Sequence, residues 1–378
     1  MSSESCCGEL NVESAVRERY SAAANQSEAA LCCPVSYDWK FLEIIPPEIL
    51  ERDYGCGDPS KHVRSGETVL DLGSGGGKIC YIAAQVVGAT GRVIGVDCND
   101  EMLNLAREHQ NAVGERLGFH NVEFRKGKIQ DLKLDLECLE KHLAENPVRS
   151  SGDWLRAEEY ANSLRTSAPL IADNSVDVVV SNCVLNLVRR EDRRQLFAEI
   201  FRVLKPGGRA VISDIVSSDD VPLELQADAK LWSGCISGAF REDRFLVAFE
   251  SAGFHGVEIL ERHTEQWTTV GPLEFRSLTV RAFKPQPVTT SDFRHAVVYR
   301  GPWKSVTTDF RQDLVRGERV DVRDAEFAML AQTPYRDQLV LLPNANVEVG
   351  AAPSGSLFVS LDLVPEAGGC CSPGSKCC

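Results

Sequence analysis

Apolar strands alternate with amphipathic helices between residues 67 and 215, and this alternation constrains the fold more than any other feature of the sequence. Each expected strand is apolar along most of its length, as in VDVVVS and RAVISDI. Such strands must be buried on both faces, and helices in the connections supply that cover. The pattern predicts a doubly wound α/β domain with a parallel sheet. We expect strands at 67–72, 92–97, 122–126, 176–181 and 209–215, and helices at 78–87, 100–117 and 191–204.

Changes of pattern divide the 378 residues into five expected segments. After residue 220, expected helices at 223–231 and 242–252 precede strands at 256–265 and 275–283, which indicates a small α+β region. Short strands such as HAVVYRG and SLFVSLDL then indicate a mainly β C-terminal appendage. The segments are an N-terminal segment at 1–60, the α/β domain at 61–220, the α+β region at 221–287, the appendage at 288–365 and a Cys-rich tail at 366–378.

Residues 133–169 form an insertion between the third and fourth expected strands, and it is longer than a crossover needs. Its apolar periodicity predicts two helices. Two interpretations stay open. The insertion is either a surface decoration, or a lid or partner contact near the ligand crevice.

The chain is acidic, with 41 basic and 55 acidic side chains and a net charge of −14. This balance argues against a nucleic-acid partner, because binding a polyanion requires a basic surface. No apolar run approaches the roughly 18 residues of a membrane span. Residues 1–10 lack the basic and apolar regions of a secretory signal. We therefore expect a cytoplasmic monomer without a nucleic-acid or membrane partner.

Fourteen cysteines are the unusual feature of the composition. A long chain without a secretory signal favours reduced thiols over a disulfide scaffold. The spacing matches no Cys/His zinc pattern, so structural zinc is a minor alternative. Adjacent cysteines can offer two soft thiolates to a large, soft ion or metalloid. Four adjacent pairs occur, at Cys6-Cys7, Cys32-Cys33, Cys370-Cys371 and Cys377-Cys378, whereas Cys80 and Cys138 are expected to be structural.

The first expected strand runs into a glycine-rich turn, D-L-G-S-G-G-G at 71–77. Glycines let the chain turn sharply and let a ligand approach the backbone. The spacing differs from the dinucleotide pattern G-x-G-x-x-G, and no Lys-Ser/Thr pair follows to hold a phosphate. Asp71 inside the turn suits an ammonium group or backbone amides, and Asp97 ends the second strand, where a ribose diol binds. A helix N-cap is the alternative role for Asp97, although Asp100 is expected to take it.

These features resemble the class I S-adenosylmethionine (SAM) methyltransferases, whose cofactor carries an amino acid and a ribose but no phosphate. The resemblance implies a Rossmann-like SAM-binding domain with its ligand loops at the carboxyl ends of the strands. The loop after the third strand then faces the adenine, which nominates Ile129, Gln130 and Asp131. The expected cofactor-binding residues are Asp71, Gly73, Gly75, Asp97, Cys98, Ile129, Gln130 and Asn182.

Cys183 follows the fourth expected strand, beside the position expected for the methyl donor. A cysteine there favours a thiophilic acceptor, and a buried thiol without a role is the alternative. Three segments resemble the arsenite methyltransferases: SNCVLNLV with Cys183, RDYGCGDP with Cys56, and LWSGCISGA with Cys235. A fourth family cysteine falls in the region of Cys32-Cys33, of which we favour Cys32. The resemblance covers residues 12–283 and, more loosely, the appendage and the tail.

The resemblance implies that the substrate is trivalent arsenic, as arsenite or its thiol adduct, and that methylation serves detoxification. Cys183 and Cys235 then grip the arsenic, while Cys56 and Cys32 complete its coordination or exchange as a disulfide. Soft arsenic prefers thiolate sulfur to oxygen, and its lone pair attacks the methyl carbon without a general base. The resemblance also implies a thiol reductant, glutathione or thioredoxin, so thioredoxin is a candidate partner.

Two departures from the family pattern keep alternatives open. The insertion at 133–169 is not part of the usual pattern, and Cys98 stands where methionine is common. A different soft or thiol acceptor, such as a selenium or antimony species, therefore remains an alternative. So do a metalloid-sequestering protein without turnover and a zinc-stabilised methyltransferase. The cysteine pairs of the tail either deliver metalloid to the site or are dispensable scavenging thiols.

Overall fold

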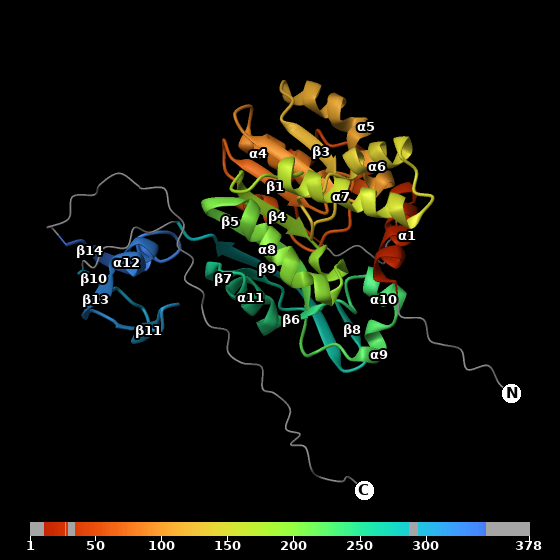
Figure 1. Ribbon diagram of the computed structural model, residues 1–378. Coiled ribbons are helices and arrows are strands. Elements are labelled where there is room, and N and C mark those ends of the chain that lie inside the picture. Colours follow the sequence, from red (N-terminus) through yellow and green to blue (C-terminus); the bar gives the residue numbers. More distant parts are fainter. Residues whose placement is uncertain (1–10, 27, 29–34, 287–293, 345–378) are drawn as a thin grey trace, which may run out of the picture.

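The computed structural model describes residues 11–26, 28, 35–286 and 294–344, and its main body is built on one mixed sheet (Figure 1). Five parallel strands come first, in the order β3-β2-β1-β4-β5. The sheet continues with β9, which is antiparallel to β5, and then with β7, which is antiparallel to β9. The strand order reverses between β1 and β4, which is where doubly wound sheets bind their ligands. The strands are β1 (Thr68–Leu72), β2 (Arg92–Asp97), β3 (Val122–Lys126), β4 (Val176–Asn182), β5 (Leu204–Ser217), β7 (His255–Arg262) and β9 (Leu273–Phe283), with β6 (Phe240–Arg241) beside β5 and β8 (Thr268–Val270) beside β9.

Helices cover both faces of this sheet. Val69 packs in the apolar layer that contains α4 and α5, whereas its neighbour Leu70 packs in the layer with α8 and α11. This alternation follows from the two-residue period of a strand. Burial on both faces confirms the doubly wound α/β prediction. The helices are α4 (Lys78–Val87), α5 (Asp100–Leu117), α8 (Arg193–Val203) and α11 (Glu242–Ser251), and in the part of the chain that the structure describes no helix is long and apolar enough to cross a membrane.

Residues 221–287 contribute their strands to the main sheet. β9 pairs with β5 from Arg209 to Ser217, and β7 pairs with the outer edge of β9. The prediction of one helix at 223–231 was wrong. Two short helices, α9 (Leu223–Gln226) and α10 (Ala229–Ser233), take its place, because the side chain of Asp228 accepts the backbone N–H groups of Lys230 and Leu231 and so caps a new helix.

The N-cap of α5 also differs from the prediction. Asn99 caps the helix, accepting the backbone N–H of Met102 at 3.0 Å. Asp100 is already the first helical residue, and its carboxylate instead forms an ion pair with Lys126 at 2.7 Å. The prediction that Asp100 is the cap was therefore wrong by one position.

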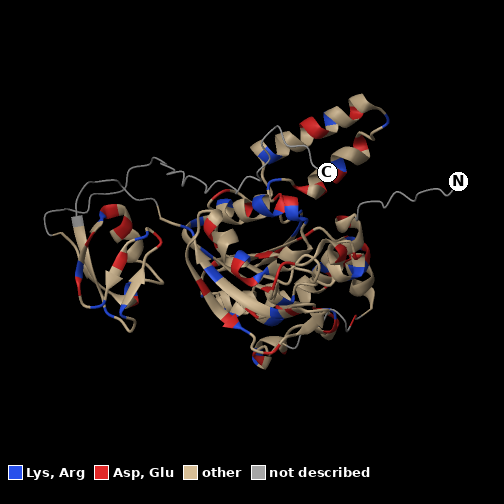
Figure 2. Cartoon of the chain, turned by 90° about the horizontal axis from the view of Figure 1, so that it is seen from below, with Lys and Arg blue, Asp and Glu red and all other residues tan. Residues whose placement is uncertain are grey.

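The insertion forms the two predicted helices, α6 (Leu136–Glu145) and α7 (Ser151–Ser167), on the side of the sheet near α1 (Figure 1). Asp135 and Ser150 cap them. Polar contacts anchor the pair, because Arg165 of α7 forms an ion pair with Asp131 at 2.9 Å and Glu140 of α6 pairs with Lys126. Acidic and basic residues are interspersed over the described chain (Figure 2).

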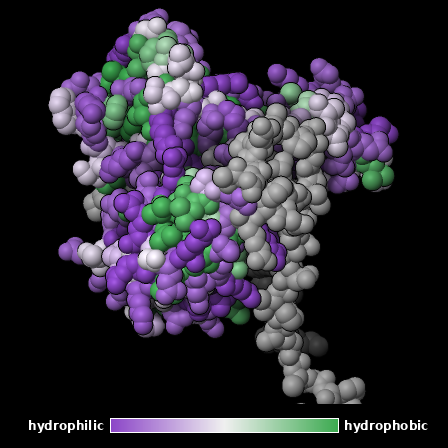
Figure 3. All heavy atoms as spheres, turned by 90° about the vertical axis from the view of Figure 1, so that its left-hand side faces the viewer, coloured by the Kyte–Doolittle hydropathy of each residue, from purple (hydrophilic) through white to green (hydrophobic). Residues whose placement is uncertain are grey.

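Residues 294–344 form a C-terminal module with its own sheet and core. β10 (Arg294–Tyr299) lies between β13 (Arg319–Arg323) and β14 (Leu339–Leu342), β11 (Ser305–Thr307) pairs with β12 (Asp313–Val315), and α12 (Asp324–Leu330) packs on the sheet. The surface on this side of the molecule is mostly hydrophilic with separate hydrophobic patches (Figure 3). The further strand expected at SLFVSLDL lies outside the described residues.

The C-terminal module contacts the main body at the start of β7. The hydroxyl of Tyr335 accepts the backbone N–H of Gly256 at 2.8 Å and donates to the carboxylate of Asp309. The ring of His255 stacks on Tyr335 with centroids 5.9 Å apart, and neither ring nitrogen has a hydrogen-bond partner among the described residues. Burial lowers the pKa of His255 to about 4, with Asp309 opposing this effect.

The buried His255 should make stability depend on pH. Its pKa is about 4 in the folded protein and about 6.5 in an unfolded chain. The unfolded chain then binds the extra proton first, and stability falls as the pH drops from about 6.5 towards 4. We expect His255→Phe to reduce this fall in the thermal unfolding midpoint, and exposed His120→Phe to leave it unchanged. Equal slopes for His255→Phe and the wild type would contradict the assignment.

Candidate active site

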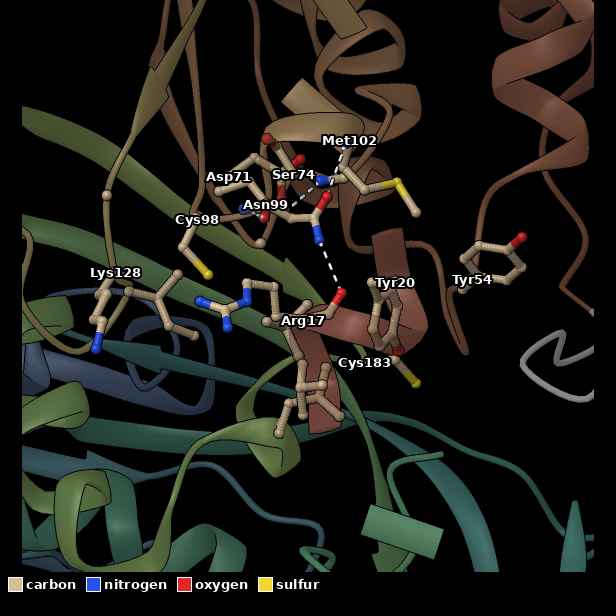
Figure 4. Close-up of a pocket in the computed structure, with 18 of the residues that line it drawn as sticks. Arg17, Tyr20, Tyr54, Asp71, Ser74, Cys98, Asn99, Met102, Lys128 and Cys183 are labelled. Atoms are coloured by element: carbon tan, nitrogen blue, oxygen red, sulfur yellow. Dashed lines mark hydrogen bonds between the residues drawn. The ribbon is translucent and has the colours of Figure 1, made fainter. Parts of the chain in front are cut away.

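A cavity of about 400 Å³ opens at the carboxyl ends of the parallel strands (Figure 4). This is the crevice that the strand-order reversal creates in a doubly wound sheet. All eight residues predicted to bind a cofactor line it: Asp71, Gly73, Gly75, Asp97, Cys98, Ile129, Gln130 and Asn182. Asp131, also nominated, does not line it, because its carboxylate is turned to Arg165 of the insertion.

The turn after β1 needs glycine for both conformation and space. Gly73 has a φ of +68° and Gly75 a φ of +51°, in the left-handed region that favours glycine. A Cβ at Gly73 would also overlap the side chain of Val184. The backbone N–H of Gly75 donates to Asp97 at 2.9 Å, so the turn is tied to the end of β2. The turn thereby presents its backbone to the cavity.

Polar groups in the cavity fit a ligand with both an amino acid and a ribose. The hydroxyl of Ser74 is buried and has no hydrogen-bond partner among the described residues, although Ser74 lines the cavity. Asp71 is buried beneath the turn, where desolvation raises the pKa of its carboxyl to about 8, and a cationic ammonium would oppose that effect. Asp97 accepts the backbone N–H of Asn99 and of Gly75, which holds its carboxylate at the end of β2.

Helix α1 (Val12–Asn25) closes one side of the cavity, and sequence reasoning missed this role. Asn99 donates to the backbone carbonyl of Arg17 at 3.2 Å, drawn as a dashed line in Figure 4, and to the hydroxyl of Ser21 at 2.9 Å. On the other side, Arg19 donates to the carbonyl of Lys230 in α10 at 2.7 Å. The apolar periodicity of residues 12–26 favours a helix, but it does not indicate against which part of the protein the helix packs. Residues of α1 that line the cavity are Glu13, Val16, Arg17 and Tyr20.

The insertion also reaches the cavity. Leu136 and Glu140 of α6 line it, near Lys126 and Lys128. Cys98 also lines the cavity and is exposed, whereas Cys80 is buried and its thiol donates to Asp71 at 3.2 Å. Contact of Cys98 with the cofactor stays a prediction. Of the two interpretations of the insertion, contact with the ligand crevice fits the structure better than surface decoration.

Three of the four predicted catalytic cysteines converge at one edge of this cavity. Cys56 and Cys183 form a disulfide with Cα atoms 5.8 Å apart, and the thiol of Cys235 donates to the carbonyl oxygen of Cys183 at 3.2 Å. The exposed fractions are 0% for Cys56, 5% for Cys183 and 4% for Cys235, and Cys183 lines the cavity. Cys32, the fourth, lies outside the described residues.

Asn182 holds the Cys56 segment against the end of β4. Its side-chain oxygen accepts the backbone N–H of Cys56 at 2.8 Å and of Gly57 at 3.1 Å, and its amide donates to the carbonyl of Gly57 at 2.8 Å. A Cβ at Gly55 would overlap the Asn182 side chain. The glycines of the Y-G-C-G segment therefore permit the close approach that brings Cys56 to Cys183.

Asp214 on β5 is a second residue that sequence reasoning missed. One carboxylate oxygen and the sulfurs of Cys56 and Cys183 all lie within 4.8 Å of one another. Burial raises the pKa of Asp214 to about 7, while backbone hydrogen bonds from Ile215, Asn186 and Leu185 oppose the shift. Among the described residues this is the one group of three that could hold a metal ion, and two of its members are joined as a disulfide.

A glycine turn without a phosphate cradle, an acidic residue ending β2 and a crevice at the strand-order reversal together define a class I SAM-dependent methyltransferase. A family model described as a methyltransferase domain matches residues 63–148 and 159–261, and a domain of unknown function (DUF8838) matches residues 286–354. The interruption at 149–158 covers the end of the loop after α6 and the first half of α7.

Proteins similar to this chain narrow the class. An arsenite methyltransferase of Aquipseudomonas alcaligenes is 34% identical over 286 residues, which is 72% of either chain. One from Mus musculus is 29% identical over 320 residues, 82% of this chain and 75% of its own. The crystal structure of an arsenic(III) S-adenosylmethionine methyltransferase from Chlamydomonas reinhardtii is similar with a TM-score of 0.56 at 25% identity, covering 83% of this chain and 98% of that one. The chain belongs to the arsenite methyltransferase family, which confirms the predicted resemblance.

The position of Cys183 predicts that cofactor binding protects the disulfide. Both sulfurs belong to buried residues, and Cys183 borders the cofactor cavity. A small reductant that enters through the cavity competes with the cofactor. We expect saturating S-adenosylhomocysteine to slow the release of thiols from Cys56–Cys183 by dithiothreitol several-fold, measured by thiol titration. Asp97→Ala, which we expect to weaken cofactor binding, should lose the protection. Equal rates with and without S-adenosylhomocysteine in the wild type would refute this route.

Proposed function

We propose that this protein transfers the methyl group of SAM to trivalent arsenic held by cysteine thiolates, with arsenite or its thiol adduct as the substrate. One observation carries the proposal. Cys56, Cys183 and Cys235 come from three segments far apart in the sequence and meet at the edge of the cofactor cavity. Three soft donors beside a methyl-donor site suit a soft acceptor such as arsenic(III).

The proposed acceptor site acts by holding arsenic next to the methyl group of SAM. Reduction of the Cys56–Cys183 disulfide yields two thiols beside that of Cys235, and three thiolates hold arsenic as a pyramid with its lone pair exposed. Of these three cysteines Cys183 lines the cavity, so arsenic bound to its sulfur is close to the methyl donor. Cys32 is the fourth proposed catalytic cysteine. The attacking atom carries no proton, and therefore no residue has to act as a general base.

The cofactor site uses the eight cavity residues predicted from sequence. Asp71 faces the amino acid portion, Gly73 and Gly75 allow the close approach, and Asp97 binds the ribose diol. The adenine lies beside Cys98, Ile129 and Gln130. When bound, SAM supplies an electrophilic methyl group, and its transfer leaves S-adenosylhomocysteine.

The surrounding assignments belong to the same proposal. Methyl transfer uses the arsenic lone pair and leaves arsenic formally pentavalent, and two cysteine thiols return it to the trivalent state by forming a disulfide. A thiol reductant, glutathione or thioredoxin, then reduces that disulfide, which makes thioredoxin a partner. Residues 61–220 bind SAM, and 1–60 with 221–287 supply the acceptor cysteines. Residues 288–365 form the C-terminal domain and 366–378 the Cys-rich tail. The protein acts as a cytoplasmic monomer in arsenic detoxification.

Serine substitutions test the acceptor cysteines. We expect Cys183→Ser and Cys235→Ser each to lower the methylation rate of arsenite about 100-fold, because one of few preorganised donors is lost and oxygen is a poor ligand for soft arsenic. Cys138→Ser is the matched control, since Cys138 is half-buried in α6, and it should keep wild-type activity. Product formation is measured by arsenic speciation with SAM and glutathione. Full activity in both single variants would overturn the coordination model.

A panel of acceptors tests the substrate, because α6 of the insertion lines the cavity and could change acceptor choice. Arsenite, trivalent antimony, selenite and an organic thiol are compared for S-adenosylhomocysteine formation. We expect arsenite to be the best acceptor. Stoichiometric arsenite binding without S-adenosylhomocysteine would instead indicate sequestration.

A further inference from the structure

Two turns that carry acceptor cysteines are connected through a buried polar pair, Asn186 and Asp214. Both residues are 0% exposed. Asn186 follows Cys183 on the same turn, and Asp214 lies on β5 between that turn and the segment of Cys235. Neither residue lines the cofactor cavity.

Asp214 anchors the turn that carries Cys183. Its carboxylate accepts the backbone N–H of Leu185 at 2.9 Å and, more weakly, that of Asn186 at 3.3 Å. It also accepts the side-chain amide of Asn186 at 2.8 Å and the backbone N–H of Ile215 at 2.8 Å. A carboxylate can accept all of these donors at once because it has about four acceptor positions.

Asn186 extends the connection to Cys235. Its amide nitrogen donates to the carbonyl of Ile215 at 2.6 Å and lies 3.4 Å from the carbonyl of Cys235. Packing reinforces this contact, since a Cβ at Gly238 would overlap the carbonyl oxygen of Asn186. The side chain of Asn186 thus spans the gap between the two turns.

Both cysteines have backbone conformations that need such support. Cys183 has a φ of +59° and Cys235 a φ of +63°, values that are uncommon for residues other than glycine. Such conformations persist where the surrounding structure holds them, and they cluster at functional sites. Asp214 supplies such support to the Cys183 turn through its hydrogen bonds with Leu185 and Asn186, and Asn186 reaches the Cys235 turn through its 3.4 Å contact with the carbonyl of Cys235.

We propose that Asn186 and Asp214 are positioning residues for the arsenic acceptor, which set the separation of the Cys183 and Cys235 thiolates so that one arsenic atom binds both. This inference rests on the proposed function and deepens it. Once arsenic has bonded to one thiolate, the second bond forms within the molecule, and its strength depends on how well the second sulfur is preorganised. If either turn becomes more mobile, the effective concentration of the second thiolate at the bound arsenic falls, while the residues that line the cofactor cavity are unchanged.

Asn186→Ser removes the bridge while leaving all three cysteines in place. We expect the dissociation constant of the reduced protein for arsenite to rise about tenfold or more, with the KM for arsenite rising more than kcat falls. The dissociation constant for SAM should stay within about twofold, because Asn186 does not line the cofactor cavity. Arsenite and SAM binding are measured by titration calorimetry, and stability by thermal unfolding.

Asn121→Ser is the matched control. Asn121 is a partly buried asparagine that directly precedes β3, and its amide donates to two backbone carbonyls at the end of α4, those of Ala84 and Gly88. It therefore lies at the amino ends of the strands, whereas Cys183 follows the carboxyl end of β4. We expect it to lower the unfolding midpoint without changing arsenite binding. If Asn186→Ser does not fold, Asp214→Asn replaces it, since an amide has one acceptor oxygen where the carboxylate has two.

Unchanged arsenite binding and KM in the Asn186 variant would overturn the positioning role. An equal loss of arsenite binding in the Asn186 and Asn121 variants would also overturn it, because the effect would then be general destabilisation. Binding and methyl transfer are separate measurements, so failure of the proposed function appears as absent methylation in the wild type. The positioning role is decided by the ratio of the arsenite dissociation constant of the Asn186 variant to that of the wild type.

Discussion

The carboxyl end of β4 is the constraint on which the rest of the site depends. Asn182 ends the strand and holds the Cys56 segment by accepting two of its backbone N–H groups. The next residue, Cys183, borders the cofactor cavity and is bonded to Cys56. Cys183 therefore connects the cofactor cavity to the Cys56 segment. A shift of this turn would move Cys183 away from the cavity. The positive φ of Cys183 is stabilised by the hydrogen bonds that Asp214 accepts from Leu185 and Asn186.

Helix α1 and the insertion both contribute residues to the wall of the cavity. α1 is tied to α5 through Asn99 and to α10 through Arg19, so it links the cofactor side to the helix that precedes Cys235. The phenol of Tyr20, whose pKa is raised mainly by burial, also hydrogen-bonds to Cys235. The insertion contributes Leu136 and Glu140 to the cavity. Helix α1 therefore contacts both the cofactor cavity and the helix that precedes Cys235.

Most of the doubly wound sheet could be predicted from sequence, because strands buried on both faces leave continuous apolar runs; helices α4 and α5 begin and end where expected. The misses have local causes. Asp100 and Asn99 are both good capping residues, and only the helix start decides between them. The break at Asp228 depends on a side-chain hydrogen bond that periodicity does not reveal. β6 and β8 are too short for a two-residue period to stand out.

The sequence by itself determined the α/β class, the glycine turn and the three cysteine segments, because each is a local pattern of residue types. The eight cavity residues followed from the resemblance. The sequence also carried the family resemblance that the similar proteins confirmed. Only the tertiary structure decided which distant residues meet: α1 against the cavity, Asp131 against Arg165 rather than the ligand, and Asp214 beside two cysteine sulfurs. These contacts depend on how strands far apart in the chain stack into one sheet, and no short window of sequence contains that information.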